Sequence, residues 1–430
     1  MNLRSYGIVT AAYWGETVTD GALHMLVLLH FYTLGFTPFQ VATLFVLYEA
    51  CGILTNLLGG WIAARFGLKL TLYSGLVLQI VSLLALSLLD PGWPAWLSVV
   101  YAVAVQGLAG IAKDLTKMSS KSAIKLVVPE NAEGALFRWV AILTGSKNAM
   151  KGIGFFLGGL LLATLGFKGG LLLLAACLGC ILALVLAALP AEMGRTKAKA
   201  PLKGLFSKSP EINLLSAARF FLFGARDIWF VVGIPVFLYD VAGWHYMQVA
   251  TFLAAWVIGY GLVQAAAPGL VRRTATGLAA EVRAARLWAL VLAVIPLALA
   301  LVLAAALPWD VLVTAAKPQG PVPSVLDPGL LLVVGLGLFG VAFALNSSLH
   351  SFLILAYSTA ERVTLDVGFY YMANAGGRLV GCLLSGLTYQ AYGVIGCLGA
   401  STLFLVASWL IATFLPKDRA SGQALAAAQR

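Results

Sequence analysis

The chain has 430 residues, of which 61% are hydrophobic and only 10% charged, and its mean hydropathy is +0.94. Soluble globular domains are about a quarter charged, so this composition excludes an ordinary soluble enzyme or binding domain. Apolar runs long enough to cross about 30 Å of hydrocarbon as helices recur along the whole length. They predict an all-α integral membrane protein embedded in a lipid bilayer.

The basic residues follow a topology pattern. A net charge of +11 would suggest a nucleic-acid partner for a soluble chain. Here many of the basic residues lie in short segments between apolar runs, where they act as topology signals, so we expect no nucleic acid. One set of loops is rich in Lys and Arg, whereas the other carries only Lys168 and Lys317. The positive-inside bias therefore places both termini in the cytoplasm.

We expect twelve membrane spans in two six-helix bundles. The spans are predicted over residues 8–33, 39–64, 70–89, 95–118, 135–163, 168–190, 211–239, 246–269, 285–307, 329–356, 367–391 and 394–415. A polar, lysine-rich linker, 191–210, separates an N-terminal bundle, 1–190, from a C-terminal bundle, 211–415, and a cytoplasmic tail, 416–430, follows.

The two halves repeat each other, at one offset in their first spans and at a second, larger offset in the fifth and eleventh spans. The motif QVAT opens both the second and the eighth span, and Asp20 of the first span corresponds to Asp227 of the seventh. In the fifth and eleventh spans the corresponding residues are Lys151 and Arg378, Gly154 and Gly381, and Gly166 and Gly393. Two pseudo-symmetric bundles that face each other are typical of a secondary transporter with its site near the bilayer midplane.

Lysines at four-residue spacing lie on the fourth and fifth spans. An ionised side chain at mid-membrane costs roughly 2.5–3.5 kcal/mol on insertion scales, so it needs a wet cavity or a partner. These two spans form a hairpin with its tip near Glu130, which puts Lys113 and Lys147 at the same depth, with Lys151 one turn further out and Lys117 one turn closer to the cytoplasm. We predict that these four lysines bind an anionic substrate. For Lys113 and Lys117 the alternative is that they anchor the helix end at the membrane surface. Lys121 and Lys125, nearer the tip, are interpreted as surface anchors.

The seventh span supplies a second basic group. Arg219 and Arg226 lie two turns apart on one face, and Arg378 is predicted to join them. Asp227 follows Arg226 directly, but adjacent side chains on a helix point about 100° apart, which weakens the alternative of a structural pair. Guanidinium groups suit phosphate-like oxyanions. Asn148 and Asn374 are candidate neutral hydrogen-bond donors to the substrate or, alternatively, contacts between helices.

Acidic residues on the first span are candidates for proton coupling. Glu16, Asp20 and His24 follow one another at four-residue spacing, so they share a helix face, and Asp227 is the corresponding candidate in the seventh span. Such a file can relay protons. The alternative is that the carboxylates are fixed counter-ions of the lysines.

No cofactor, metal or catalytic residue is expected. The five cysteines all lie in apolar segments, where the C-x-x-C formed by Cys177 and Cys180 favours close packing over redox or metal chemistry. The four histidines form no metal or nucleophile set, which argues against a membrane enzyme.

The segment GGWIAARFGLK after the second span resembles the loop motif of the major facilitator superfamily. Gly60, Arg65, Gly67 and Lys69 fit that motif, whereas Ala64 stands where its aspartate usually does. The resemblance implies the twelve-helix fold of that superfamily.

Several longer segments closely resemble the ArsJ family of organoarsenical efflux permeases. They include ETVTDGALHMLVLLHFYTLGFTPFQ, GIAKDLTKMSSKSAIKLVVP, LTGSKNAMKGIGFFLGG and NLLSAARFFLFGARDIWFVV. The resemblance implies a monomeric transporter of the bacterial inner membrane that exports 1-arseno-3-phosphoglycerate and confers arsenate resistance. In that family a glyceraldehyde-3-phosphate dehydrogenase supplies the substrate. We expect proton antiport to drive export.

An exchanger of inorganic phosphate, organophosphate or sugar phosphate with the same fold is the alternative function. The lack of a cysteine cluster in the charged spans argues against trivalent arsenite, which favours thiolates.

Overall fold

The computed structural model describes residues 3–66, 68–90, 92–125, 133–189, 209–272, 278–313, 327–358 and 363–417. The predicted hairpin tip near Glu130, the side chains of Lys121 and Lys125, and nearly all of the linker and the tail lie outside the described residues.

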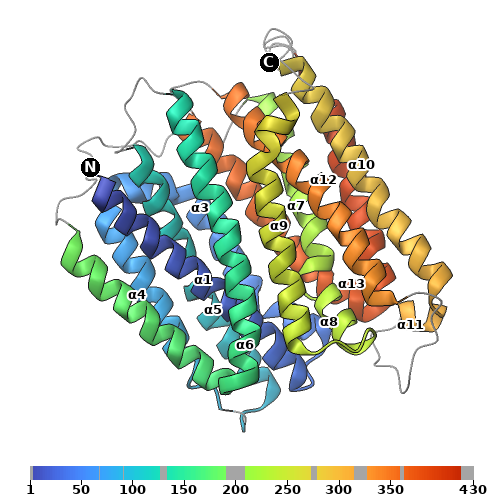
Figure 1. The fold of residues 1–430 in the computed structure, drawn as a ribbon, viewed down its shortest axis with the longest axis horizontal. Helices are drawn as coiled ribbons and strands as arrows, with labels where there is room; N and C mark the ends of the chain where they lie inside the picture. Colours follow the sequence, from blue (N-terminus) through green and yellow to red (C-terminus); the bar gives the residue numbers. More distant parts are fainter. Residues whose placement is uncertain are drawn as a thin grey trace. The chain divides into compact units, whose positions relative to one another are not determined.

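Within these ranges every regular element is an α-helix (Figure 1). The helices are α1 (Leu3–Thr33), α2 (Pro38–Thr43), α3 (Val46–Phe66), α4 (Leu68–Leu86), α5 (Ala95–Lys125), α6 (Glu133–Ala188), α7 (Pro210–Phe230), α8 (Gly233–Asp240), α9 (Tyr246–Arg272), α10 (Leu278–Ala306), α11 (Trp309–Val313), α12 (Pro328–Tyr357) and α13 (Val363–Thr413).

The helices match the predicted spans. Nine segments of the described chain are long and apolar enough to cross a membrane. Two of them, in α6 and α13, contain a kink that divides each into two spans, and α1, with 31 residues, is long enough to cross although it carries Glu16 and Asp20. The predicted all-α fold with twelve spans is therefore confirmed.

Both kinks fall at glycines that the sequence repeat relates. Gly166 has φ 70° and Gly393 has φ 58°. A left-handed backbone of this kind is readily adopted only by glycine. The repeat therefore preserves the residue that lets the fifth span turn into the sixth and the eleventh into the twelfth.

The chain forms two compact units. The first unit contains residues Met1–Leu34, Leu47–Lys203 and Tyr246–Ala265, and the second contains Gly35–Val46, Gly204–His245 and Ala266–Arg430. Most of α9 thus belongs to the first unit and α2 to the second. The predicted boundaries of the bundles, at 190 and 211, stay a prediction.

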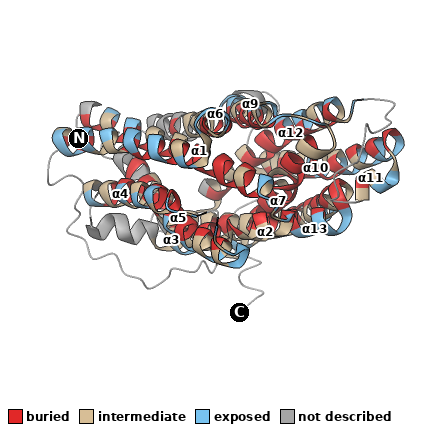
Figure 2. Cartoon of the chain, turned by 90° about the horizontal axis from the view of Figure 1, so that it is seen from below, coloured by how far each residue is buried: buried red, intermediate tan, exposed pale blue. Residues whose placement is uncertain are grey.

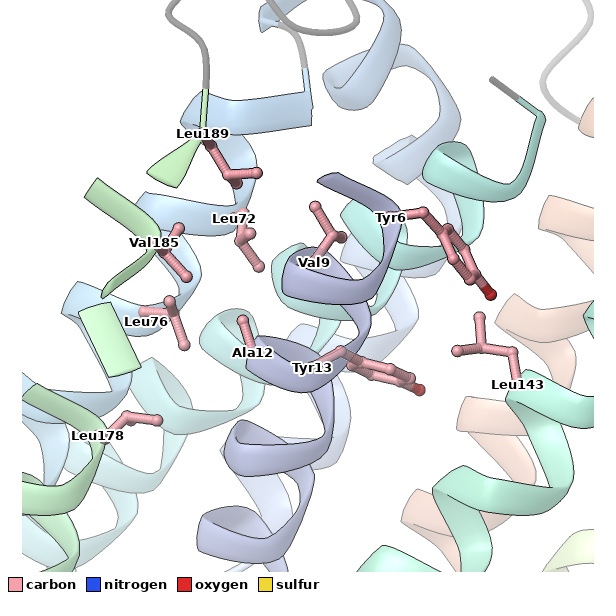
Figure 3. Close-up of a cluster of buried hydrophobic side chains, with 10 residues drawn as sticks. All are labelled: Tyr6, Val9, Ala12, Tyr13, Leu72, Leu76, Leu143, Leu178, Val185 and Leu189. Atoms are coloured by element: carbon pink, nitrogen blue, oxygen red, sulfur yellow. The ribbon is translucent and has the colours of Figure 1, made fainter. Parts of the chain in front are cut away.

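The first unit has an apolar core around α1. In Figure 3, Val9 and Ala12 face Leu72, while Tyr6 and Tyr13 extend toward Leu143. α1 therefore packs between the two arms of α6, with α4 alongside the second arm.

The second unit has a corresponding core, in which α7, α10, α12 and α13 meet through Ile212, Val282, Leu353 and Tyr370. Exposed leucines such as Leu403, which is 70% exposed, lie on the same helices as buried residues (Figure 2). Such faces suit contact with lipid.

Basic side chains donate hydrogen bonds to the C-terminal ends of α6 and α13. Lys69, the described member of the loop motif, donates to the carbonyl of Leu189 at the end of α6. Arg286 of α10 donates to the carbonyls of Ala412 and Leu415 at the end of α13, at 3.0 and 2.8 Å. Carbonyls at a helix end commonly lack partners within their own helix, so both residues provide hydrogen-bond donors to these helix ends.

Glycines bring the charged helices close together. A Cβ on Gly154 of α6 would lie 2.3 Å from the carbonyl oxygen of Val18 in α1, and one on Gly381 of α13 would lie 2.5 Å from that of Gly224 in α7. These contacts occupy corresponding positions in the repeat. They set the distance between the helices that carry Asp20 and Lys151 in the first unit, and Asp227 and Arg378 in the second.

Candidate charged transport site

Asp20 is the centre of the charged cluster in the first unit. The Tyr48 hydroxyl of α3 donates to Oδ1 of Asp20 at 2.6 Å, and Nζ of Lys151 lies 3.7 Å from Oδ2. Asp20 is 3% exposed. The carboxylate is thus shared between a short hydrogen bond and a looser ion pair.

Lys113 lies on the other side of Tyr48. Its ammonium is 3.8 Å from the centre of the tyrosine ring, a cation–π contact. Lys113 forms no ion pair with any carboxylate in the part of the chain that the structure describes. Lys113 thus contacts Tyr48, and Lys151 contacts Asp20, to which Tyr48 donates. That both lysines bind one substrate stays a prediction.

Glu16 is a fully buried carboxyl group on α1. Neither of its oxygens has a hydrogen-bond partner among the described residues. It interacts electrostatically with Asp20, Lys113, Asp114 and Lys147. Lys147 therefore lies near Glu16.

His24 borders the same cluster. Its ring centre lies 6.1 Å from those of both Tyr48 and Phe155. Lys151 also approaches Phe155, with Nζ 5.6 Å from the ring centre. Glu16, Asp20 and His24, predicted to share a face of α1, therefore all border the charged cluster.

Lys117 has its own hydrogen-bond partners, Asn56 and Asp114. Its ammonium donates to Asn56 at 2.6 Å and to Asp114 at 3.2 Å. Thr55 also donates to Asp114, at 2.6 Å. Asp114 thus acts as the counter-ion of Lys117, and substrate binding by Lys117 stays a prediction.

Asn148 contacts a neighbouring helix. Its amide donates to Oε1 of Gln264 in α9 at 2.9 Å. This hydrogen bond matches the alternative interpretation of Asn148 as a contact between helices. Its binding role stays a prediction.

Asp227 is the centre of the charged cluster in the second unit. Nε and Nη2 of Arg226 lie 2.6 and 2.5 Å from Oδ1, and Nε of Arg378 lies 3.0 Å from Oδ2. The expectation that the divergence of adjacent residues weakens an Arg226–Asp227 pair was wrong. The arginine side chain is long enough to fold back along the helix.

The two clusters are versions of one arrangement. In each unit an aspartate on the first helix pairs with a basic residue on the fifth, which confirms the predicted correspondence of Asp20 with Asp227 and of Lys151 with Arg378. The second partner of the aspartate differs. Asp20 accepts a hydrogen bond from a tyrosine, whereas Asp227 pairs with a second guanidinium.

Arg219 is buried at 4% exposure in the second unit. Its Nε donates to Asn374 at 2.9 Å, and its Nη1 donates to the carbonyl and hydroxyl oxygens of Ser347, at 3.2 and 3.0 Å. All three acceptors are neutral. The rings of Phe223 and Tyr370 lie 3.9 and 5.0 Å from Cζ.

These contacts leave the charge of Arg219 unbalanced. No described carboxylate forms an ion pair with it. A cation–π contact contributes up to about 2 kcal/mol, whereas burying an ion costs several kcal/mol. The rings therefore do not offset the burial of this guanidinium.

A sequence model of the Major Facilitator Superfamily matches residues 7–351. The chain belongs to the major facilitator superfamily. It is a secondary membrane transporter, not an enzyme, and it carries a small-molecule substrate across the lipid bilayer.

Two solved structures show the same fold. A POT family transporter in complex with a thioalcohol-conjugated peptide is 14% identical, and one in complex with 5-aminolevulinic acid is 15% identical. Each has a TM-score of 0.76, and each alignment covers 96% of both chains. No curated protein matches the chain.

Several partners in this major facilitator site were not predicted from sequence. Tyr48, Asn56 and Gln264 each bond a predicted site residue. The available signal was that polar residues within apolar spans seek partners. Which residue meets which depends on the rotation of each helix, and the sequence does not give it.

We predict that removing the charge of Asp227 destabilises this transporter. Asp227→Asn leaves two guanidinium groups without their carboxylate, and breaking a buried ion pair costs about 3–5 kcal/mol. The measurement is the unfolding free energy of purified protein during titration with a denaturing detergent. Asp310→Asn, at an exposed position, is the control and should change little. Equal losses in the two variants would contradict the structural role of Asp227.

Proposed function

We propose that this transporter exports 1-arseno-3-phosphoglycerate from the cytoplasm across the bacterial inner membrane and so confers arsenate resistance. The resemblance of several long segments to the ArsJ family supports the identity of the substrate. The observation that supports a negatively charged substrate is the burial of Arg219. This arginine has neutral acceptors and no carboxylate partner in the described chain.

The charge balance within the spans favours an anionic substrate. Lys117, Lys151, Arg226 and Arg378 each contact an aspartate. Lys113 and Arg219 have no such partner among the residues described. A ligand with phosphate and arsenate groups would supply several negative charges.

We propose that the anionic groups bind basic residues in each unit. The proposed binding residues are Lys113, Lys117, Lys147 and Lys151 in the first unit and Arg219, Arg226 and Arg378 in the second, with Asn148 and Asn374 as neutral donors. Glyceraldehyde-3-phosphate dehydrogenase is the proposed source of the substrate. We propose that the transporter acts as a monomer with both termini in the cytoplasm.

Proton coupling is proposed to involve Glu16, Asp20, His24 and Asp227. Burying an ionised carboxylate without a hydrogen-bond partner costs several kcal/mol, and a proton would remove that cost at Glu16. Asp20 is held by Lys151 at 3.7 Å. An anion that binds Lys151 would compete with Asp20 for this cation.

This competition gives the coupling a sign. A carboxylate that loses its cationic partner binds a proton more readily. Binding of the anion at Lys151 and binding of a proton at Asp20 would therefore favour each other. Antiport, as predicted from sequence, requires them to oppose each other. We therefore propose that a proton leaves together with the anion.

The membrane potential can drive such export. Moving one charge through 100 mV changes the free energy by about 2.3 kcal/mol. The net charge exported, that of a substrate with several negative charges plus one proton, would stay negative. An inside-negative potential then pushes it outward.

The substrate is tested in everted membrane vesicles that contain this protein. We expect arsenate uptake only when glyceraldehyde 3-phosphate, the dehydrogenase and its nicotinamide cofactor are all present, because free arsenate lacks the second anionic group. Radiolabelled arsenate in the lumen is measured after filtration, with vesicles that lack the protein as control.

Equal uptake with and without the dehydrogenase system would overturn the organoarsenical proposal. Exchange of labelled phosphate for internal phosphate or sugar phosphate would favour the alternative exchanger.

The sign of coupling is tested by acidifying the vesicle lumen at constant external pH. The lumen corresponds to the outside of the cell, so joint export of anion and proton predicts slower uptake, whereas antiport predicts faster uptake. We expect Asp20→Asn, a mimic of the protonated state, to weaken the response to lumenal pH. Asp310→Asn, at an exposed position, should retain it. Faster uptake into acidic lumens would contradict joint export.

A further inference from the structure

We propose that Arg219, Asn346 and His350 form a binding site for one tetrahedral oxyanion group, phosphate or arsenate, within the second unit. The proposal deepens the proposed function and rests on it only in taking this group to be part of the exported substrate. The site differs from the cluster around Asp227, whose guanidinium groups already hold a carboxylate.

Arg219 has donors to spare. A guanidinium carries five N–H donors, and the hydrogen bonds of Arg219 to described residues use Nε and Nη1. Nη2 donates to none of the described residues. A buried, unbalanced cation whose Nη2 still has N–H groups to donate is suited to form a charge-assisted hydrogen bond with an oxyanion.

The sequence repeat explains why this charge is unbalanced. At the offset that relates Asp20 to Asp227, Glu16 corresponds to Phe223 and Ala12 to Arg219. The second unit thus has an arginine where the first has a small core residue, and a phenylalanine where the first has a carboxyl group. The Phe223 ring contacts Arg219 at 3.9 Å, but it brings no negative charge.

Asn346 and His350 provide further polar atoms on α12, the helix whose Ser347 bonds Arg219. Both are fully buried. Neither end of the Asn346 amide and neither nitrogen of His350 has a hydrogen-bond partner among the described side chains and backbone. His350 interacts electrostatically with Arg219.

The geometry of α12 gathers these groups on one face. A helix turns by about 100° per residue, so His350 lies between Asn346 and Ser347 around the axis. Ser347 bonds Arg219 directly. Ser347 and His350 therefore lie next to the guanidinium, and Asn346 follows His350 around the helix axis.

The donors in this cluster match a tetrahedral oxyanion. The unused Nη2 of the Arg219 guanidinium can donate to an oxygen of a phosphate-like group. An asparagine amide and a neutral imidazole each offer an N–H donor. Buried polar atoms without partners are costly, and an anion that accepts from the N–H groups of Asn346 and His350 would remove the cost of leaving those donors unpaired.

The test is binding of inorganic phosphate and inorganic arsenate to the purified full-length protein in detergent, measured by calorimetry and by the shift in melting temperature. We expect both anions to bind and to raise the melting temperature, and acetate to bind more weakly. Arg219→Gln should weaken the affinity by about tenfold or more, the effect of losing a charge-assisted hydrogen bond.

A second variant separates binding from folding. Asn346→Leu replaces an unpartnered buried amide by an apolar group, so it should leave the melting temperature without anion unchanged or higher, yet weaken phosphate binding several-fold. Gln79→Leu is the matched control. Gln79 is also fully buried with an unpartnered amide, but it lies in α4 of the first unit. It should not change phosphate binding.

Unchanged phosphate affinity in both Arg219→Gln and Asn346→Leu would overturn the proposal. Stabilisation by added phosphatidylglycerol that Arg219→Gln abolishes, with none by phosphate, would overturn it in favour of a lipid head group. Phosphate binding that depends on Arg219, together with arsenate uptake that ignores the dehydrogenase system, would support the site but contradict the organoarsenical proposal.

Discussion

A buried aspartate that neutralises a basic residue on a neighbouring helix is the interaction on which both units depend. An ion inside a membrane span is tolerated only with a partner or water. Asp20 meets Lys151, and Asp227 meets Arg378. Each pair lies beside a glycine, Gly154 or Gly381, at which a Cβ would collide with the helix that carries the aspartate. Close packing and charge pairing are thus parts of one repeated arrangement.

The differences between the copies provide the asymmetry that transport needs. Asp20 accepts from Tyr48 and is held loosely by its lysine, whereas Asp227 is held by two guanidinium groups. Asp20 is therefore suited to exchange its partner, and Asp227 is suited to stay fixed. Arg219, which has no carboxylate partner in the described chain, is the cation that an anionic substrate would complete.

Much of the fold could be predicted from the sequence because hydropathy and the internal repeat are properties of the chain itself. The ends of the spans, the turns at Gly166 and Gly393, and the correspondence of Asp20 with Asp227 all came from such patterns. The contacts of Arg226 could not be predicted, because its long side chain reaches Asp227 against the direction that helix geometry suggests. Tyr48 was missed because its bond to Asp20 depends on how α3 rotates against α1.

The most direct test of this account exchanges the charges of the first pair. Asp20→Lys and Lys151→Asp each place like charges together, and the double variant restores an opposite pair in reverse order. The unfolding free energy of the three proteins is measured in detergent. The account predicts that each single variant is strongly destabilised and that the double variant recovers a large part of the loss. A double variant no more stable than the worse single variant would contradict it.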